Sequence, residues 1–289
     1  MTKIADIHSR HSGGPLFICD FSPPRGAVYD ELRLASPIDA HCLSVPYNPG
    51  KSVYASSVIA AHSVRSHTGR EVAFTIASRD MNILAIQSLL LGAALLGLEN
   101  AIVVRGDDFS ESEFRRTKPV HDRTPTALIR SIAKMNNGTD FRGRRLSTPT
   151  DFCIGATIDT NRGLDLEVAL THRKIEGGAH FFITQPGYSP EGPLRFLQTY
   201  EQRYGQHPSA PIFFGIQMIS PGGRSFSPIP KTVRDDLGAG VAPADIASRV
   251  IDRFLAADIT NFYLMPPIFP GGERDYQAAQ SVLDRYKER

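Results

Sequence analysis

Asp20 is the first residue in the sequence whose type and setting could carry out chemistry. It opens the segment Asp-Phe-Ser-Pro-Pro-Arg-Gly (20–26), in which two prolines fix φ and give the chain a defined direction after the acid. A carboxylate at the mouth of a site can act as a general acid if partial burial raises its pKa toward the working pH. From position alone, a helix-capping or loop-binding aspartate is an equally good interpretation.

Two further segments place polar groups after apolar runs. Arg105-Gly106-Asp107 offers a cation, a residue without a side chain and an anion, which suits close approach of a polar heterocycle, although an internal ion pair is the stronger alternative. The segment 174–185 starts at Lys174 and ends at Gln185. A glutamine amide can read a donor and acceptor pair on a pterin or pyrimidine edge, or it can simply satisfy loop backbone.

Metal and nucleotide motifs are not apparent. The nine histidines form no HxH or HExxH pair, and neither a GxSxG nor a Walker sequence occurs. We therefore expect no metal site and interpret the histidines as structural or surface residues.

The elements that must position these residues follow a regular rhythm. Eight short apolar runs are expected strands, and a helical pattern follows nearly every one. The runs are 16–20, 40–45, 71–77, 101–105, 152–158, 180–185, 211–217 and 261–265. This alternation predicts an α/β fold with a parallel sheet closed into a (β/α)8 TIM barrel, formed by residues 1–289 as a single domain. The active face is then the carboxyl end of the strands, marked by Asp20, Tyr47, Ser78, Asp107, Asp159, Gln185, Gln217 and Pro266.

Helices are expected between the strands. The clearest covers 82–98, with Leu84, Leu91, Leu95 and Leu98 on one apolar face that Ile83, Ile86 and Leu90 widen, Asp80 as a cap and Gly97 near its end. The others cover 52–66, 125–135, 164–176, 190–204, 242–257 and 274–286. Long loops at 107–124 and 219–232 lie on the expected active face, where ligand contacts are usually built.

Composition narrows the class of protein. The chain has 289 residues, of which 41% are hydrophobic and 21% charged, with a net charge of +2, so it is expected to fold around a large core without binding nucleic acid or a membrane. Cys19, Cys42 and Cys153 lie in or beside apolar runs and are interpreted as buried thiols in a reducing compartment. No signal peptide is apparent, and we infer a cytoplasmic protein.

Taken together and in order, these pieces resemble the methylenetetrahydrofolate reductase family, a family of flavin-dependent barrels. The resemblance covers nearly the whole chain. It is carried by 20–26, by 78–82 running into 90–97, by Arg105-Gly106-Asp107, and by Lys174 through Gln185 and Pro186.

The resemblance implies an oxidoreductase that interconverts 5,10-methylenetetrahydrofolate and 5-methyltetrahydrofolate, with FAD as cofactor, NADH or NADPH as co-substrate and a folate as substrate. It implies catalytic roles for Asp20 and Asp107, with Asp20 protonating the folate nitrogen. Asp20, Asp107 and Gln185 would bind the folate. The residues implied to contact FAD are Thr75, Arg105, Gly106, Asp107, Glu167 and Lys174. A homo-oligomer is left open.

Departures from the family pattern keep two alternatives open. The family acid is usually glutamate, so Asp20 is one methylene shorter, and Thr75 stands where many members have a flavin-contacting histidine. One alternative is a redox-inactive folate-binding or regulatory barrel of a one-carbon complex. The other is a reductase that transfers hydride without flavin.

Overall fold

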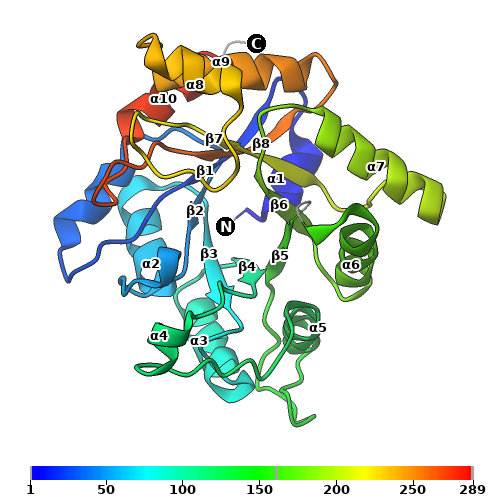
Figure 1. The fold of residues 1–289 in the computed structure, drawn as a ribbon. Coiled ribbons are helices and arrows are strands. Elements are labelled where there is room, and N and C mark those ends of the chain that lie inside the picture. Colours follow the sequence, from blue (N-terminus) through cyan, green and yellow to red (C-terminus); the bar gives the residue numbers. More distant parts are fainter. Residues whose placement is uncertain (1, 160–161, 288–289) are drawn as a thin grey trace.

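The eight expected strands form a closed parallel barrel in the order β1 to β8, as seen in the computed structural model, which describes residues 2–159 and 162–287 (Figure 1). This confirms the expected TIM barrel. The strands are β1 (Leu16–Asp20), β2 (Cys42–Val45), β3 (Val72–Ala77), β4 (Asn100–Val104), β5 (Cys153–Ile158), β6 (Phe181–Pro186), β7 (Ile212–Gln217) and β8 (Asn261–Met265).

Helices surround the barrel. They are α1 (Ile4–Arg10), α2 (Ser57–Thr68), α3 (Ile83–Leu95), α4 (Glu111–Phe114), α5 (Pro125–Asn136), α6 (Leu164–Glu176), α7 (Glu191–Tyr204), α8 (Lys231–Gly238), α9 (Pro243–Leu255) and α10 (Tyr276–Asp284), with 3-10 turns η1 (Tyr29–Ala35) and η2 (Pro49–Lys51). The sequence pattern did not predict α1, α4, α8 or the 3-10 turns. Short helices such as α4 have too few residues to show a helical period.

Alternation along each strand separates an inner core from an outer one. Leu16 and Ile18 point into the barrel with Phe181 and Phe213, whereas Phe17 belongs to the core between strands and helices. Because successive side chains of a strand point to opposite faces, the same alternation turns Asp20 inward at the carboxyl end of β1. The strand therefore fixes where Asp20 lies.

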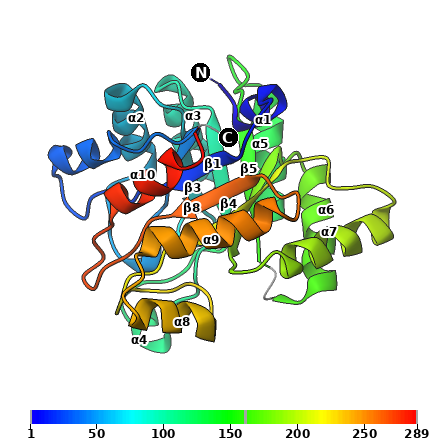
Figure 2. The same cartoon turned by 90° about the horizontal axis from the view of Figure 1, so that it is seen from above.

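The two ends of the barrel differ. Figure 2 shows α1 at one end and α4 and α8 at the opposite end. Ile4 of α1 is buried in the inner core, and its backbone N–H donates to the Asn100 side chain at the start of β4. Helix α1 thus closes the amino-terminal end of the barrel and leaves the carboxyl end for a site.

The orientation of α3 corrects the sequence prediction. Leu84 is 63% exposed and Leu95 90% exposed, so the predicted leucine face is turned to solvent and only Leu98, beyond the helix, is buried. Ile83, Ile86 and Leu90 face the core instead. This helix is apolar on all sides, so its period could not show which face is inside.

The helix caps also differ in part from the prediction. The side chain of Asn82, not Asp80, accepts the cap hydrogen bond from the backbone of Ala85. Asp80 is instead paired with Arg79. Gly97 has a positive φ of 71° just after α3, as expected of a helix-terminating glycine.

Two further features concern the cysteines and the helices of the described residues. The three cysteines are buried and free of disulfides. No described helix combines the length and the apolar character that crossing a membrane requires.

Candidate functional site

A cavity of about 710 Å³ opens at the carboxyl end of the barrel, where the sequence predicted the active face. It has the size of a typical ligand site. Of the residues implied by the resemblance, those lining the cavity are Asp20, Thr75, Arg105, Gly106, Asp107, Lys174 and Gln185. Glu167 is not among the described lining residues.

Asp20 lies on the cavity wall with both carboxylate oxygens engaged. The hydroxyl of Tyr263 on β8 donates to Oδ1 at 2.8 Å, and a guanidinium nitrogen of Arg274 lies 3.2 Å from Oδ2. Arg274 reaches Asp20 from the segment just before α10, and its Nη1 is buried with no hydrogen-bond partner among the described residues. Of the alternative interpretation, a helix-capping role is therefore wrong for Asp20, while its pair with Arg274 does bind the loop before α10.

The electrostatics of Asp20 result from opposing effects. Burial raises the pKa of Asp20, while the charge of Arg274 and the hydrogen bond from Tyr263 act to lower it. Burial, together with the neighbouring Asp20, also raises the pKa of Tyr263 well above its usual range, so Tyr263 stays a neutral hydrogen-bond donor. Asp20 is thus a buried carboxyl whose proton affinity two neighbours control.

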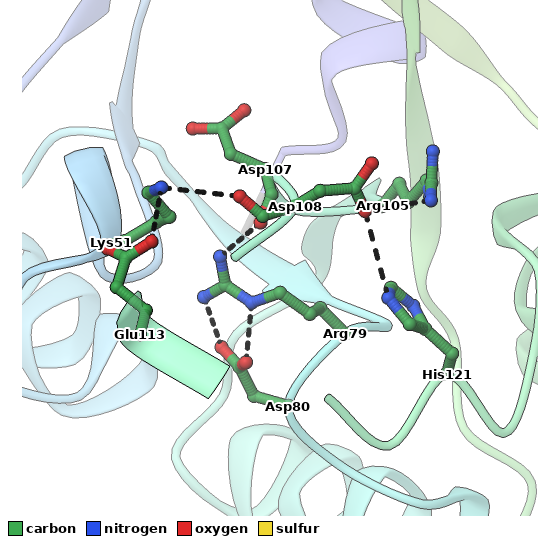
Figure 3. Close-up of polar contacts among 8 residues, drawn as sticks. All are labelled: Lys51, Arg79, Asp80, Arg105, Asp107, Asp108, Glu113 and His121. Carbon is green, nitrogen blue, oxygen red and sulfur yellow. Dashed lines mark hydrogen bonds and ion pairs between the residues drawn. The ribbon is translucent and has the colours of Figure 1, made fainter. Parts of the chain in front are cut away.

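Asp107 contributes a second acid to the cavity, beyond the end of β4. Arg105 pairs with Asp108 at 2.8 Å and not with Asp107. No described residue hydrogen-bonds the Asp107 carboxylate, and Figure 3 shows it pointing away from the surrounding contacts. Among the described residues Arg105 and Asp107 form no ion pair, so the alternative expected for this triplet is wrong, and Asp107 is available to a ligand.

Lys174 on α6 lines the cavity from the opposite side. Its Nζ donates to the backbone oxygen of Thr157 at 2.6 Å. The same Nζ lies 3.5 Å from Oε1 of Glu167, which is about two turns earlier on the same helix. Glu167 is 1% exposed and lies behind Lys174, outside the cavity lining. It affects the cavity through its ion pair with Lys174. Burial lowers the pKa of Lys174, whereas Glu167 opposes this shift.

Three arginines extend this basic wall. Arg130 on α5, Arg173 on α6 and Arg162 all line the cavity. A side chain on Gly177 would lie 3.2 Å from both Arg130 Cγ and the backbone oxygen of Arg173, so these two arginines are close neighbours. Arg162 pairs with Asp159 at 3.1 Å. The cavity therefore has the buried acid Asp20 at the end of β1 and these cations on the side of α5 and α6, while Asp107 lies between them after β4.

Gln185 faces the cavity on the same side of β6 as Phe181 and Ile183, which point into the barrel. The pairing of β6 with β7 shifts register between Ile183 and Pro186, so Gln185 lies in an irregular part of the strand. Gly215 of β7 lies against it, because a Cβ there would be 2.6 Å from the Thr184 oxygen and 2.9 Å from Gln185. Gln185 itself is exposed, and its amide has no hydrogen bond to another described residue.

The other residues predicted at strand ends differ in whether they line the cavity or lie behind its wall. The Gln217 amide accepts from the backbone of Phe226 and donates to the Arg224 oxygen, which holds Phe226 at the cavity wall. Tyr47 lines the cavity. Ser78, Asp159, Gln217 and Pro266 are not among its described lining residues.

Sequence reasoning missed the partners of Asp20. Tyr263 could have been found, because it lies two residues before the end of β8 and so points inward with Met265. Arg274 was predicted only as the start of a helix, and it reaches Asp20 through a contact across 254 residues that no local pattern encodes.

A parallel eight-stranded barrel with a polar cavity at the carboxyl ends of its strands defines the class of (β/α)8 proteins with a ligand site at the usual face. Within that class, the chain belongs to the methylenetetrahydrofolate reductase family, whose sequence model matches residues 4–233.

Two solved structures are similar to this chain, and the first of them confirms the fold. An uncharacterized protein from Clostridium thermocellum that binds two copies of 5-methyl-5,6,7,8-tetrahydrofolic acid has 14% identity and a TM-score of 0.64, with 96% of each chain covered. A lyase or mutase candidate from Burkholderia cenocepacia has 16% identity, a TM-score of 0.48 and coverage of 89% of this chain and 85% of that one. Comparison with curated proteins finds no match.

Proposed function

We propose that the protein is a flavin-dependent oxidoreductase that interconverts 5,10-methylenetetrahydrofolate and 5-methyltetrahydrofolate, with NADH or NADPH as electron donor or acceptor. The observation that carries this proposal is the division of one cavity into a wall with the buried acid Asp20 and a wall with several cations. Membership of the family supports the same reaction.

The basic wall fits FAD. A diphosphate needs cationic donors, and Arg105, Lys174 and the three cavity arginines described above offer them in the lining of the same cavity. Gly106 lines the cavity at the end of β4, and a side chain there would lie 3.1 Å from the Cβ of Arg79. When bound, the flavin supplies a hydride acceptor and donor between the nucleotide and the folate.

Side chains of the protein supply the proton for the folate and hold its pterin ring in place. In the reductive direction, Asp20 gives a proton to the folate nitrogen whose bond to the methylene carbon breaks, and the ring opens to a cationic iminium. Asp107 and Gln185 bind the pterin edge, because their carboxylate and amide are free to pair with its donors and acceptors. Because nucleotide and folate would use the same part of the cavity, one has to leave before the other binds.

Separate assays of the two half-reactions test the role of Asp20. We expect Asp20→Asn to slow folate turnover by about 10²- to 10⁴-fold, the usual contribution of a general acid, and to leave nucleotide oxidation by an electron-accepting dye nearly unchanged. Asp30→Asn is the matched control, because Asp30 is exposed, pairs with the exposed Arg33 and does not line the cavity. Equal loss of both half-reactions in Asp20→Asn would contradict the acid role.

A folate-binding barrel without redox chemistry is the second candidate. The ion pair of Asp20 with Arg274 favours it, because a carboxylate with both oxygens engaged can also serve only to build the floor of a binding site. The neighbouring structure from Clostridium thermocellum is described as a folate-binding protein of uncharacterized function. Steady folate-dependent oxidation of NADH or NADPH by the purified chain would rule this candidate out.

A further inference from the structure

Arg79, which follows β3, is buried in the wall of the cavity and makes contacts that no proposed catalytic or cofactor role uses. Its side chain is 5% exposed, and it forms a two-pronged pair with Asp80, through Nε at 2.6 Å and Nη2 at 2.7 Å (Figure 3). This pair raises the pKa of Arg79, so the guanidinium is permanently charged.

The remaining contacts of Arg79 are with the long loop 107–124 that carries Asp107. Nη1 donates to the backbone oxygen of Asp107 at 2.7 Å. The guanidinium also lies over the ring of Phe109, 4.3 Å from its centre, which adds a cation–π attraction. Both contacts hold the start of the loop.

The backbone of Arg79 holds the other end of the same loop. Its carbonyl oxygen accepts from the backbone N–H of Val120 at 2.7 Å, and its own N–H donates to the Arg105 oxygen at 3.0 Å. One residue therefore connects β4, the first residues of the loop and its last residues. Closing a loop of this length costs conformational entropy, which such a connection reduces in the folded chain.

A second contact fixes the middle of the loop. Lys51 Nζ lies 2.8 Å from Oε2 of Glu113 on α4 and donates to the backbone oxygen of Asp108 at 3.2 Å (Figure 3). Glu113 in turn caps α4 through Ser110. The loop is thus held at three points, while the Asp107 carboxylate is left without a hydrogen bond from the described residues.

We propose that Arg79 is a positioning residue that holds the Asp107 carboxylate in the geometry for binding the folate. It acts through the backbone of Asp107 and does not touch the ligand. A carboxylate held in place before binding loses less entropy when the ligand arrives, so the arrangement increases affinity. This inference rests on the proposed role of Asp107 in folate binding.

Hydrogen–deuterium exchange without ligand tests the connection itself. We expect Arg79→Gln to speed exchange of the amides of Asp107–Phe109, because the start of the loop loses its side-chain contacts with Arg79. Exchange of Val120 and His121 should change less, because the backbone oxygen of Arg79 that holds them is kept. Arg116→Gln removes the same charge from an exposed position in the same loop and should leave exchange at both ends unchanged. Unchanged exchange in Arg79→Gln would overturn the proposal.

A double-mutant cycle tests whether Arg79 acts through Asp107. With 5-methyltetrahydrofolate as the probe, we expect Arg79→Gln and Asp107→Ala each to weaken binding by about tenfold, the loss of one charge-assisted hydrogen bond. The double variant should bind no more weakly than Asp107→Ala alone. Additive losses would overturn the proposal, because Arg79 would then act independently of Asp107.

Controls separate this proposal from loss of the fold and from failure of the proposed function. Arg79→Lys keeps the charge but loses the two-pronged geometry, so it should show the same effects more weakly if Arg79→Gln does not fold. If the unmodified protein does not bind 5-methyltetrahydrofolate, the proposed function fails. The exchange experiment then still decides whether Arg79 holds the loop.

Discussion

At the scale of residues, the chemistry of the site depends on how Asp20 holds its proton. Asp20 is a shorter acid than the family's usual glutamate, and the structure surrounds it with Tyr263 and Arg274 on β8 and before α10. Cys19 and Tyr276 also lie close to this group, and both are buried. The proton affinity of Asp20 therefore depends on residues from opposite ends of the chain.

Tyr263→Phe should move the pH dependence of the folate half-reaction to higher pH. Asp20 donates a proton only while protonated, so the rate falls as pH rises through its pKa, and removing the Tyr263 hydrogen bond removes an effect that lowers this pKa. The rate of folate reduction against pH, measured with both proteins, checks this expectation. A shift of the alkaline limb to lower pH would contradict it, and Tyr276→Phe provides a comparison in which the direct bond to Asp20 is kept.

The residues that the sequence identified are those that follow strands. Asp20, Asp107 and Gln185 could be predicted because the carboxyl end of each strand in a barrel faces the site. Arg274 and the arginines of the basic wall could not, because they reach the cavity from helices and loops by tertiary packing. Local patterns carry no information on such contacts.

At the scale of elements, the shape of the site depends on a glycine whose missing side chain lets two strands approach closely. The β6 irregularity beside Gln185 brings the backbone of Thr184 and Gln185 so close to β7 that only glycine fits at position 215. The sequence predicted both strands within two residues of their observed bounds. It did not predict the irregularity, because a change of pairing register leaves no mark in the hydrophobic alternation of a single strand.

Gly215→Ala should weaken folate binding and lower the free energy of unfolding by about 1–3 kcal/mol, the usual cost of overpacking. The new Cβ would lie 2.6 Å from the Thr184 oxygen, and backbone cannot move aside as a flexible side chain can. Gly92→Ala is the control, because nothing lies within 4 Å of its Cβ position in α3. It should stabilise the protein by about 0.5–1 kcal/mol. Urea denaturation and 5-methyltetrahydrofolate titration measure both effects, and unchanged folate affinity in Gly215→Ala would contradict the role of the irregularity.

At the scale of the whole molecule, the end of the barrel that α1 closes and packs is opposite the end that holds the site. Helix α1 closes one end, and the cavity occupies the other. We propose that residues 1–289 form one domain, because α1 packs into the barrel while the ring of Phe17 on β1 contacts the ring of Tyr286 near the other terminus. The eight-strand rhythm was enough to predict this architecture, since each strand and helix repeats a simple pattern.

Ile4→Ala should lower the free energy of unfolding by about 2–5 kcal/mol, because it removes a fully buried side chain from the closed end of the barrel. Folate affinity should stay the same, since the closed end does not contribute to the cavity. Chemical denaturation together with 5-methyltetrahydrofolate titration checks both statements. A stable variant with weakened folate binding would contradict the separation of the two ends.

The most direct test of the central claim, a flavoenzyme acting on folate, is the visible spectrum of the purified protein supplied with FAD under anaerobic conditions. We expect a bound flavin spectrum that bleaches when NADH or NADPH is added and recovers when 5,10-methylenetetrahydrofolate follows, because the same cavity holds both reaction partners in turn. A protein that binds no FAD, or whose reduced flavin is not reoxidised by the folate, would contradict the claim.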